Sequence, residues 1–206
     1  MIALFDSSSL ISFVRYYLPF DNGGFIDKFL ENKISEEQIV IIDEIYSECR
    51  RFDAGLVYDS FSSFQKKSYK SGIFPYNTKD LIPGSNIFYN MIIKDFLNSE
   101  LPIIKEIQTP EGPKNNTELV KISDLTQREL ESLKKQFLTS TDGKLIILAD
   151  NLKDKEEIVV VTEEKERSND SKAFKKIPAI CKLLGITCIS LPVYLEKYSN
   201  LNIEIR

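Results

Sequence analysis

Apolar residues gather in short runs that alternate with longer amphipathic stretches along most of the chain. The short runs are rich in Ile, Val and Leu, and their length favours buried strands over helices. These predicted strands cover residues 2–5, 38–42, 157–162 and 186–191. Apolar spacing and capping residues predict helices over residues 7–17, 25–32, 55–67, 86–97 and 122–137, and from residues 43, 140, 178 and 192 onward.

This alternation predicts an α/β fold, with a central and mainly parallel sheet flanked by helices. We expect a single domain over residues 1–206. Residues 69–125 interrupt the alternation with many prolines and one helical stretch, and they are too many for a plain loop in a compact domain. They are therefore interpreted as a largely helical insertion, whose aromatic side chains favour a small core over a base-stacking platform.

Length and composition narrow the class of protein. With 206 residues, of which 42% are hydrophobic, the chain can bury one sizeable core. No apolar run approaches the roughly 20 residues that a membrane-spanning helix needs, and the first residues do not resemble a signal peptide. We therefore expect a cytoplasmic protein that does not enter a membrane.

The chain contains no histidine, which excludes several kinds of catalytic site. Serine or cysteine nucleophiles paired with histidine are ruled out, and so is a histidine general base. The three cysteines have neither the number of a disulfide framework nor the spacing of a zinc site. No glycine-rich nucleotide-binding loop follows a strand. Acid–base chemistry would fall to carboxylates, lysine, tyrosine or water activated by a metal.

The net charge of −4 excludes a uniformly basic nucleic-acid binder. A nuclease would need local basic patches instead. Two lysine groups are candidates, although solvated helix faces explain them equally well. They are Lys66, Lys67 and Lys70, and Lys172, Lys175 and Lys176.

Carboxylates follow two of the predicted strands directly. Asp6 closes the first strand, and Glu163 and Glu164 follow residues 158–162. Ligands of open α/β sheets bind at the carboxyl edge of the strands, and carboxylates gathered there repel one another unless a divalent cation lies between them. Hard oxygen ligands suit Mg²⁺ or Mn²⁺. The pattern therefore predicts a metal-dependent site, with phosphodiester cleavage as its leading chemistry.

Two further acids could join this group. Glu48 lies on the helix after the second strand, and Asp142 lies in a first helical turn, where the helix dipole favours an anion. Each acid also has a structural interpretation. Asp6 and Asp142 could only cap helices, Glu48 could be a surface residue, and the Glu163–Glu164 pair could be a solvated strand end.

The motifs around these acids resemble those of PIN-domain nucleases. In that family a strand ends in Asp before a small hydroxyl residue, a Glu lies on a helix after a short strand, an Asp leads into an apolar helix, and a later strand ends in Thr-x-acid. The corresponding segments are MIALFDSSSLI at 1–11, DEIYSE at 43–48, DGKLI at 142–146 and VVVTEE at 159–164.

The end of the chain is similar to one bacterial and archaeal subfamily, the DUF4411 type. There a Thr-Glu-Glu strand is followed by a Lys-Ile-Pro helix and a final strand, as in KIPAIC at 176–181 and GITCI at 185–189. The resemblance covers roughly residues 1–55 and 138–198, and leaves 69–125 without a counterpart. The last acid, Glu164, stands where many PIN domains have Asp.

The resemblance implies an endoribonuclease that uses Mg²⁺ or Mn²⁺. Asp6, Asp142 and Glu164 would hold the metal, Glu48 would complete the shell, and Glu163 stands beside it. Thr162 or Ser8 could orient the carboxylates. It further implies the toxin of a toxin–antitoxin pair, a possible antitoxin partner and a possible homodimer.

Two alternatives remain open at this point. A haloacid-dehalogenase-like phosphatase also has Asp after its first strand, but it needs a second Asp at position 8, which is Ser here. A catalytically weak or inactive PIN-like module could bind RNA or a protein through the insertion, and the acidic net charge agrees with that reading.

Overall fold

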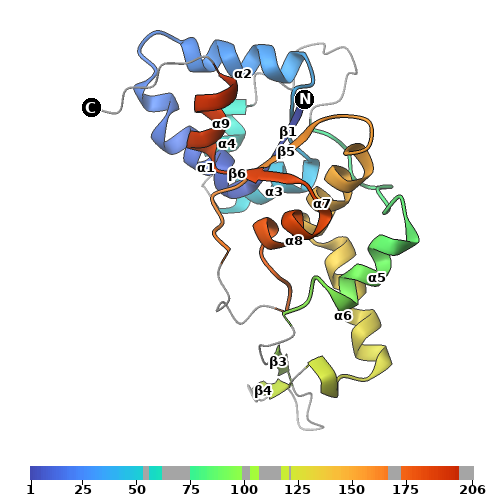
Figure 1. Ribbon diagram of the computed structural model, residues 1–206. Helices are drawn as coiled ribbons and strands as arrows, with labels where there is room; N and C mark the ends of the chain where they lie inside the picture. The colour runs from blue at the N-terminus through green and yellow to red at the C-terminus, as the bar shows by residue number, and fades with distance from the viewer. Residues whose placement is uncertain are drawn as a thin grey trace.

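A parallel four-stranded sheet forms the centre of the protein, as seen in a computed structural model (Figure 1). The structure describes residues 1–52, 56–61, 75–98, 103–106, 117–120, 122–166 and 173–199. Within them the strand order is β2–β1–β5–β6, and every neighbouring pair is parallel. The strands are β1 (Ile2–Phe5), β2 (Ile39–Val40), β5 (Ile158–Val161) and β6 (Thr187–Ile189). The predicted α/β fold with a central parallel sheet is confirmed.

The strand order reverses direction between β1 and β5. From β1 the chain moves to β2 on one side, and it later returns to β5 on the other side. Phe5 pairs with Val161, so both strands end at the same level and the next residues, Asp6 and Thr162, leave the sheet together. In open α/β sheets, ligands bind at the carboxyl ends of strands where the order reverses.

Helices cover the sheet in two groups, which Figure 1 shows on opposite sides of the strands. The first group consists of α1 (Ser7–Tyr16), α2 (Phe25–Ser35), α3 (Asp43–Phe52), α4 (Leu56–Phe61) and α9 (Leu191–Tyr198). In this group α1 contacts α3, α4 and α9, and α2 contacts β2. The second group, packed in sequence order, consists of α5 (Asn86–Lys94), α6 (Gln127–Thr139), α7 (Thr141–Leu152) and α8 (Ile177–Leu184). Short 3-10 helices are η1 (Leu18–Phe20) and η3 (Ile122–Asp124).

Local capping chemistry explains where several helices begin and end. Ser140 caps α7, and Thr126 forms a reciprocal capping box with Glu129 at the start of α6. Helix α8 has Pro178 in its first turn and ends at Gly185, whose φ of 68° favours glycine. The starts predicted for α7 and α8 are confirmed.

The second strand is shorter than residues 38–42 predict, because a distant segment takes over its hydrogen bonds. Tyr76 donates its backbone N–H to the Ile41 carbonyl (2.8 Å) and accepts from the Asp43 N–H (2.9 Å). The helix predicted over 55–67 is α4 where it is described, and its remainder lies outside the described residues.

Residues 69–125 contain more than the predicted helix. Helix α5 is present, and an antiparallel pair, β3 (Ile103–Glu106) with β4 (Thr117–Val120), is added to it. Phe88, Ile92 and Phe96 belong to the same buried core as the sheet residues. The interpretation of 69–125 as an insertion remains a prediction.

Among the described residues, no helix is both long enough and apolar enough to cross a membrane.

Candidate active site

Asp6 is the buried centre of the candidate site. Its side chain is only 4% exposed, and it caps α1 by accepting a hydrogen bond from the Ser9 N–H at 2.8 Å. The Ser8 hydroxyl lies 2.9 Å from both carboxylate oxygens, and the Thr162 hydroxyl donates to Oδ2 at 2.6 Å. Asp6 therefore caps α1, as one of its two sequence interpretations predicted, and its side chain also faces the end of β5.

Burial sets the ionisation of Asp6. Removal from water raises the pKa of its carboxyl from the ordinary value, and the hydrogen bonds from Thr162, Ser9 and Ser8 oppose that shift without cancelling it. A carboxylate with a raised pKa at a strand end is characteristic of functional sites.

The turn after β5 is built on the hydroxyl groups that contact Asp6. The Thr162 hydroxyl accepts a hydrogen bond from the Glu164 N–H at 3.0 Å, and the Ser8 hydroxyl accepts one from the Glu163 N–H at 3.0 Å. Thr162 is 2% exposed. Thr162 and Ser8, which we expected to orient the acids, therefore contact Asp6 and the turn that carries the two glutamates. Asp6, Glu163 and Glu164 lie in one hydrogen-bonded group.

The two glutamates each bind the start of a helix. Glu163 accepts a hydrogen bond from the Leu191 N–H at 2.8 Å, at the start of α9. Glu164 accepts one from the Ile177 N–H at 3.2 Å, at the start of α8, and pairs with Lys176 at 2.9 Å. Helix starts favour such negative charges. Glu164 is thus held by α8, which the spacing of acids along the chain did not indicate.

Glu48 and Asp142 lie on two helices that an ion pair joins. Glu44, one turn before Glu48 on the same face of α3, pairs with Lys144 in α7. Asp142 lies in the first turn of α7, as predicted, and its side chain is exposed. On the neighbouring part of α3, the Cys49 sulfur lies 3.9 Å from the Ser7 carbonyl oxygen, next to Asp6.

Three of the predicted acids therefore lie together at the carboxyl edge of the sheet: Asp6, Glu163 and Glu164 are joined through Ser8 and Thr162. Glu48 lies on α3 and Asp142 on α7, the two helices that the Glu44–Lys144 pair joins. Within the residues that the structure describes, no three Asp, Glu, Cys or His side chains are placed so that they could hold a metal ion. The arrangement brings together acids suited to a divalent cation without forming its complete ligand set.

Two lysines pair with acids near the candidate site, and only Lys176 is indicated by the sequence. Lys176 had a signal, because it stands in a lysine group and in the Lys-Ile-Pro motif. The pairing of Lys144 with Glu44 joins residues 100 positions apart, so no local pattern could reveal it. Lys66, Lys67, Lys70 and Lys172 lie outside the described residues.

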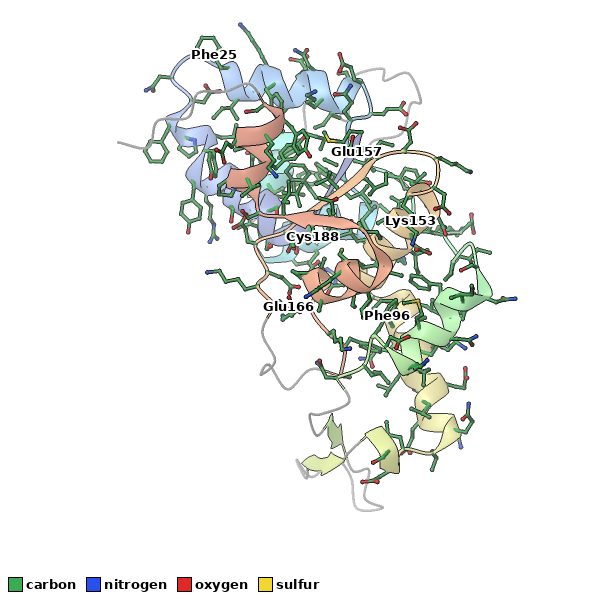
Figure 2. All side chains as sticks on the ribbon, in the orientation of Figure 1. Phe25, Phe96, Lys153, Glu157, Glu166 and Cys188 are labelled. Carbon is green, nitrogen blue, oxygen red and sulfur yellow. The ribbon has the colours of Figure 1, made fainter. Side chains whose placement is uncertain are left out.

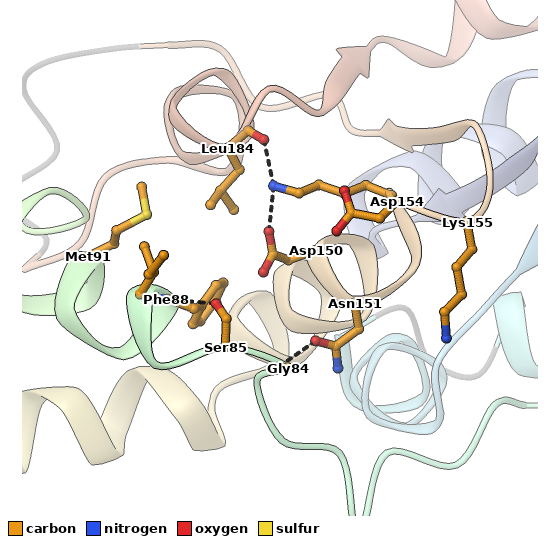
Figure 3. Close-up of a pocket in the computed structure, with 11 residues that line it drawn as sticks. Gly84, Ser85, Phe88, Met91, Asp150, Asn151, Asp154, Lys155 and Leu184 are labelled. Atoms are coloured by element: carbon orange, nitrogen blue, oxygen red, sulfur yellow. Dashed lines mark hydrogen bonds and ion pairs between the residues drawn. The ribbon is translucent and has the colours of Figure 1, made fainter.

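A cavity of about 690 Å³ lies outside the candidate site, between α5 and the ends of α7 and α8 (Figure 3). Its polar groups bind one another: Lys153 pairs with Asp150 at 2.8 Å, and Asn151 accepts from the Gly84 N–H at 2.7 Å. In Figure 2, Lys153 and Glu157 mark the amino edge of β5, and Glu166 lies past its carboxyl end. This cavity is therefore on the amino side of the sheet, away from Asp6.

Comparison with known families gives a match to part of the chain. The model of a family described as a domain of unknown function (DUF4411) matches residues 103–200. That segment contains Asp142, Glu163, Glu164 and Lys176, but neither Asp6 nor Glu48. No curated protein and no solved structure matches the chain. The match agrees with the resemblance of the chain's end, while likeness to PIN domains rests on the motifs alone.

The raised pKa of Asp6 predicts how pH changes stability. The folded protein holds the Asp6 proton more tightly than the unfolded chain, whose aspartates titrate near pH 4. The free energy of unfolding, taken relative to Asp6→Asn, is therefore highest below about pH 4 and decreases as the pH rises through the folded-state pKa. Urea unfolding of both proteins with chelator, from pH 4 to 8, measures the difference.

The exposed Asp154 provides the control for that measurement. The difference between wild type and Asp154→Asn gives the effect of the same chemical change at an exposed position, against which the Asp6 difference is compared. A stability difference for Asp6 that grows with pH would mean that its hydrogen bonds outweigh its burial.

Proposed function

We propose that this protein is a metal-dependent nuclease that cleaves RNA at the carboxyl edge of its sheet. One observation carries the proposal. Buried Asp6 at the end of β1 meets Thr162, Glu163 and Glu164 at the end of β5, where the strand order reverses. Carboxylates concentrated at that point suit a cation and the phosphate that it would bind.

The donor chemistry fits Mg²⁺ or Mn²⁺. Asp6, Glu164, Glu48 and Asp142 would hold the ion, with Glu163 beside them, and all offer hard oxygen atoms. A cation would also compensate the burial that disfavours the charged form of Asp6. When bound, it would lower the pKa of a water molecule and neutralise charge on the phosphate. Glu164 would have to exchange Lys176 and the Ile177 N–H for this role.

The chain's own groups have separate roles in the proposal. Ser8, Thr162 and the Ser9 N–H fix the direction of the Asp6 carboxylate. Lys176, once released from Glu164, would remain close to the site as a cation for the substrate phosphate. The absence of histidine fits this scheme, because water activation does not need an imidazole.

The biological role proposed is that of a cytoplasmic toxin. In this proposal an antitoxin protein covers the site, and two copies of the chain form a homodimer. These parts rest on the resemblance to PIN toxins alone.

A second function has one observation in its favour. The described acids do not form a metal-ligating group, and Glu164 is already paired with Lys176. A PIN-like module that binds RNA or a protein without cleaving would have this arrangement permanently. The two functions differ in their response to metal.

Cleavage of an RNA pool tests the proposal. The pool should hold structured and single-stranded RNAs, incubated with the wild-type protein in Mn²⁺ or in chelator. We expect fragments in Mn²⁺ only. Mn²⁺ should also raise the thermal stability, by about 2.7 kcal/mol at a hundred times its dissociation constant. A folded protein that shows neither cleavage nor stabilisation would favour the binding module.

A further inference from the structure

A second, smaller cavity adjoins the candidate site. It has a volume of about 230 Å³ and lies between the end of α6, the starts of α7 and α8, and the chain that leads into α8. Asp142 lines it, and so does Lys176, whose ammonium group pairs with Glu164. The cavity therefore opens between two parts of the acidic edge rather than at a distance from it.

Two aromatic rings form one wall of this cavity. The centroids of Phe137 and Phe174 are 5.0 Å apart. Phe137 is 2% exposed and also packs against Phe96, so its ring is fixed by the core. The Phe174 carbonyl accepts a hydrogen bond from the Asn98 side chain at 3.0 Å, which fixes the backbone beside the cavity. The wall is thus formed in advance of any ligand.

Polar groups complete the lining. The exposed Gln136 can offer both a donor and an acceptor through its amide, and Lys175 and Lys176 bring two positive charges to a surface that already holds Asp142. An apolar wall, an amide for hydrogen bonding and cations beside a carboxylate edge together match a nucleotide. The Phe174 ring would stack on the face of a base, and Lys175 and Lys176 would attract the backbone phosphates.

We propose that this cavity binds one unpaired base of a single-stranded RNA, next to the bond that is cut. The inference rests on the proposed nuclease function and adds its substrate class. A base inside a duplex cannot reach such a pocket, because its faces are covered by stacked neighbours. Single-stranded RNA is therefore favoured, whatever its overall sequence.

Binding in chelator tests the cavity independently of cleavage. The probes are a short fluorescent single-stranded RNA and the same RNA with abasic positions, measured by anisotropy with the wild-type protein. Base–aromatic stacking predicts about tenfold tighter binding of the RNA that keeps its bases. Equal affinity for the two RNAs, or no binding of either, would overturn the proposal.

Filling the cavity gives the first variant. Ala173 lines the cavity, and Ala173→Leu should weaken binding of the base-containing RNA to the abasic level while leaving the abasic RNA unchanged. Ala179→Leu is the matched control, because Ala179 shares the outer face of α8 with exposed Lys182 and Leu183. An Ala173→Leu protein that binds both RNAs as the wild type does would assign the cavity no role in RNA binding.

Phe174 gives a second pair of variants. Phe174→Tyr keeps an aromatic face and should keep the preference for bases, whereas Phe174→Leu should lose most of it. If both lose it equally, the ring does not stack on a base and the inference fails. Base-dependent binding without metal-dependent cleavage would support base binding by the cavity and overturn the proposed nuclease function. Equal cleavage of RNAs with and without abasic positions would support the nuclease function and overturn base binding by the cavity.

Discussion

The Asp6→Asn variant should lose metal-dependent RNA cleavage by about a hundredfold or more while remaining folded. Asp6 is the most deeply buried of the proposed acids, and it contacts Ser8 and Thr162, whose hydroxyl groups hold the turn that carries Glu163 and Glu164. Asparagine has nearly the same shape but no negative charge, so it cannot help to hold a divalent cation. Cleavage rates with saturating Mn²⁺ measure the loss.

Folding of this variant has two opposing contributions. Asparagine avoids the cost of burying a charge, but its amide nitrogen cannot accept the hydrogen bond that the Thr162 hydroxyl gives to Oδ2. The two effects are of similar size, so the net change in stability should stay within about 2 kcal/mol. A circular dichroism spectrum and melting curve like those of the wild type would establish that lost activity is not lost structure.

Asp154→Asn is the matched control for activity. It makes the same chemical change at an exposed residue beyond the end of α7, beside the larger cavity at the opposite edge of the sheet. Its cleavage should equal that of the wild type. Full activity of Asp6→Asn would remove Asp6 from the reaction and, with it, the observation on which the proposed function rests.

The approach of Asp6 and Glu164 at one edge of the sheet could be predicted because its signals are local. Each follows a short apolar run, and a run of that composition is a buried strand whose carboxyl end must leave the sheet. Adjacent parallel strands end at the same edge, so the two acids had to approach each other once β1 and β5 paired. The parallel α/β architecture followed from the same alternation of strands and helices.

The partners of these acids could not be predicted in the same way. Glu164 pairs with Lys176 because the start of α8 faces the end of β5, and Glu44 in α3 pairs with Lys144 in α7, on a helix distant in the sequence. Both contacts depend on how helices pack, which their own sequences do not encode. The shortened β2 has the same origin, since Tyr76 hydrogen-bonds to residues on either side of Ile42.

The corner between α6 and α7 depends on one glycine. Ser140 is both the last cap of α6 and the first cap of α7: its hydroxyl donates to the Phe137 carbonyl at 2.8 Å and accepts from the Gly143 N–H at 3.0 Å. This brings Gly143 against the Phe137 carbonyl. A Cβ atom at Gly143 would lie 1.8 Å from that oxygen, far inside any allowed contact.

Gly143→Ala should therefore lower the free energy of unfolding by about 3 kcal/mol. Alanine in a helix is favoured over glycine by about 1 kcal/mol, but the clash involves backbone atoms that cannot turn aside, so the clash decides the sign. Helix α7 would have to move away from α6. That movement would loosen Phe137 in the core and displace Asp142 at the edge of the site.

Urea unfolding of Gly143→Ala and Gly84→Ala measures this effect against a matched control. A Cβ at Gly84 would meet only the Asn151 side chain, whose oxygen lies at 2.9 Å, and that side chain can shift at the cost of the hydrogen bond it accepts from the Gly84 N–H. Gly84→Ala should therefore cost less than about 1 kcal/mol. Equal stability of the two variants would mean that α6 and α7 can separate freely. A lower free energy of unfolding for Gly143→Ala but not for Gly84→Ala would show that the close approach of α6 and α7, which positions Asp142, requires glycine at position 143.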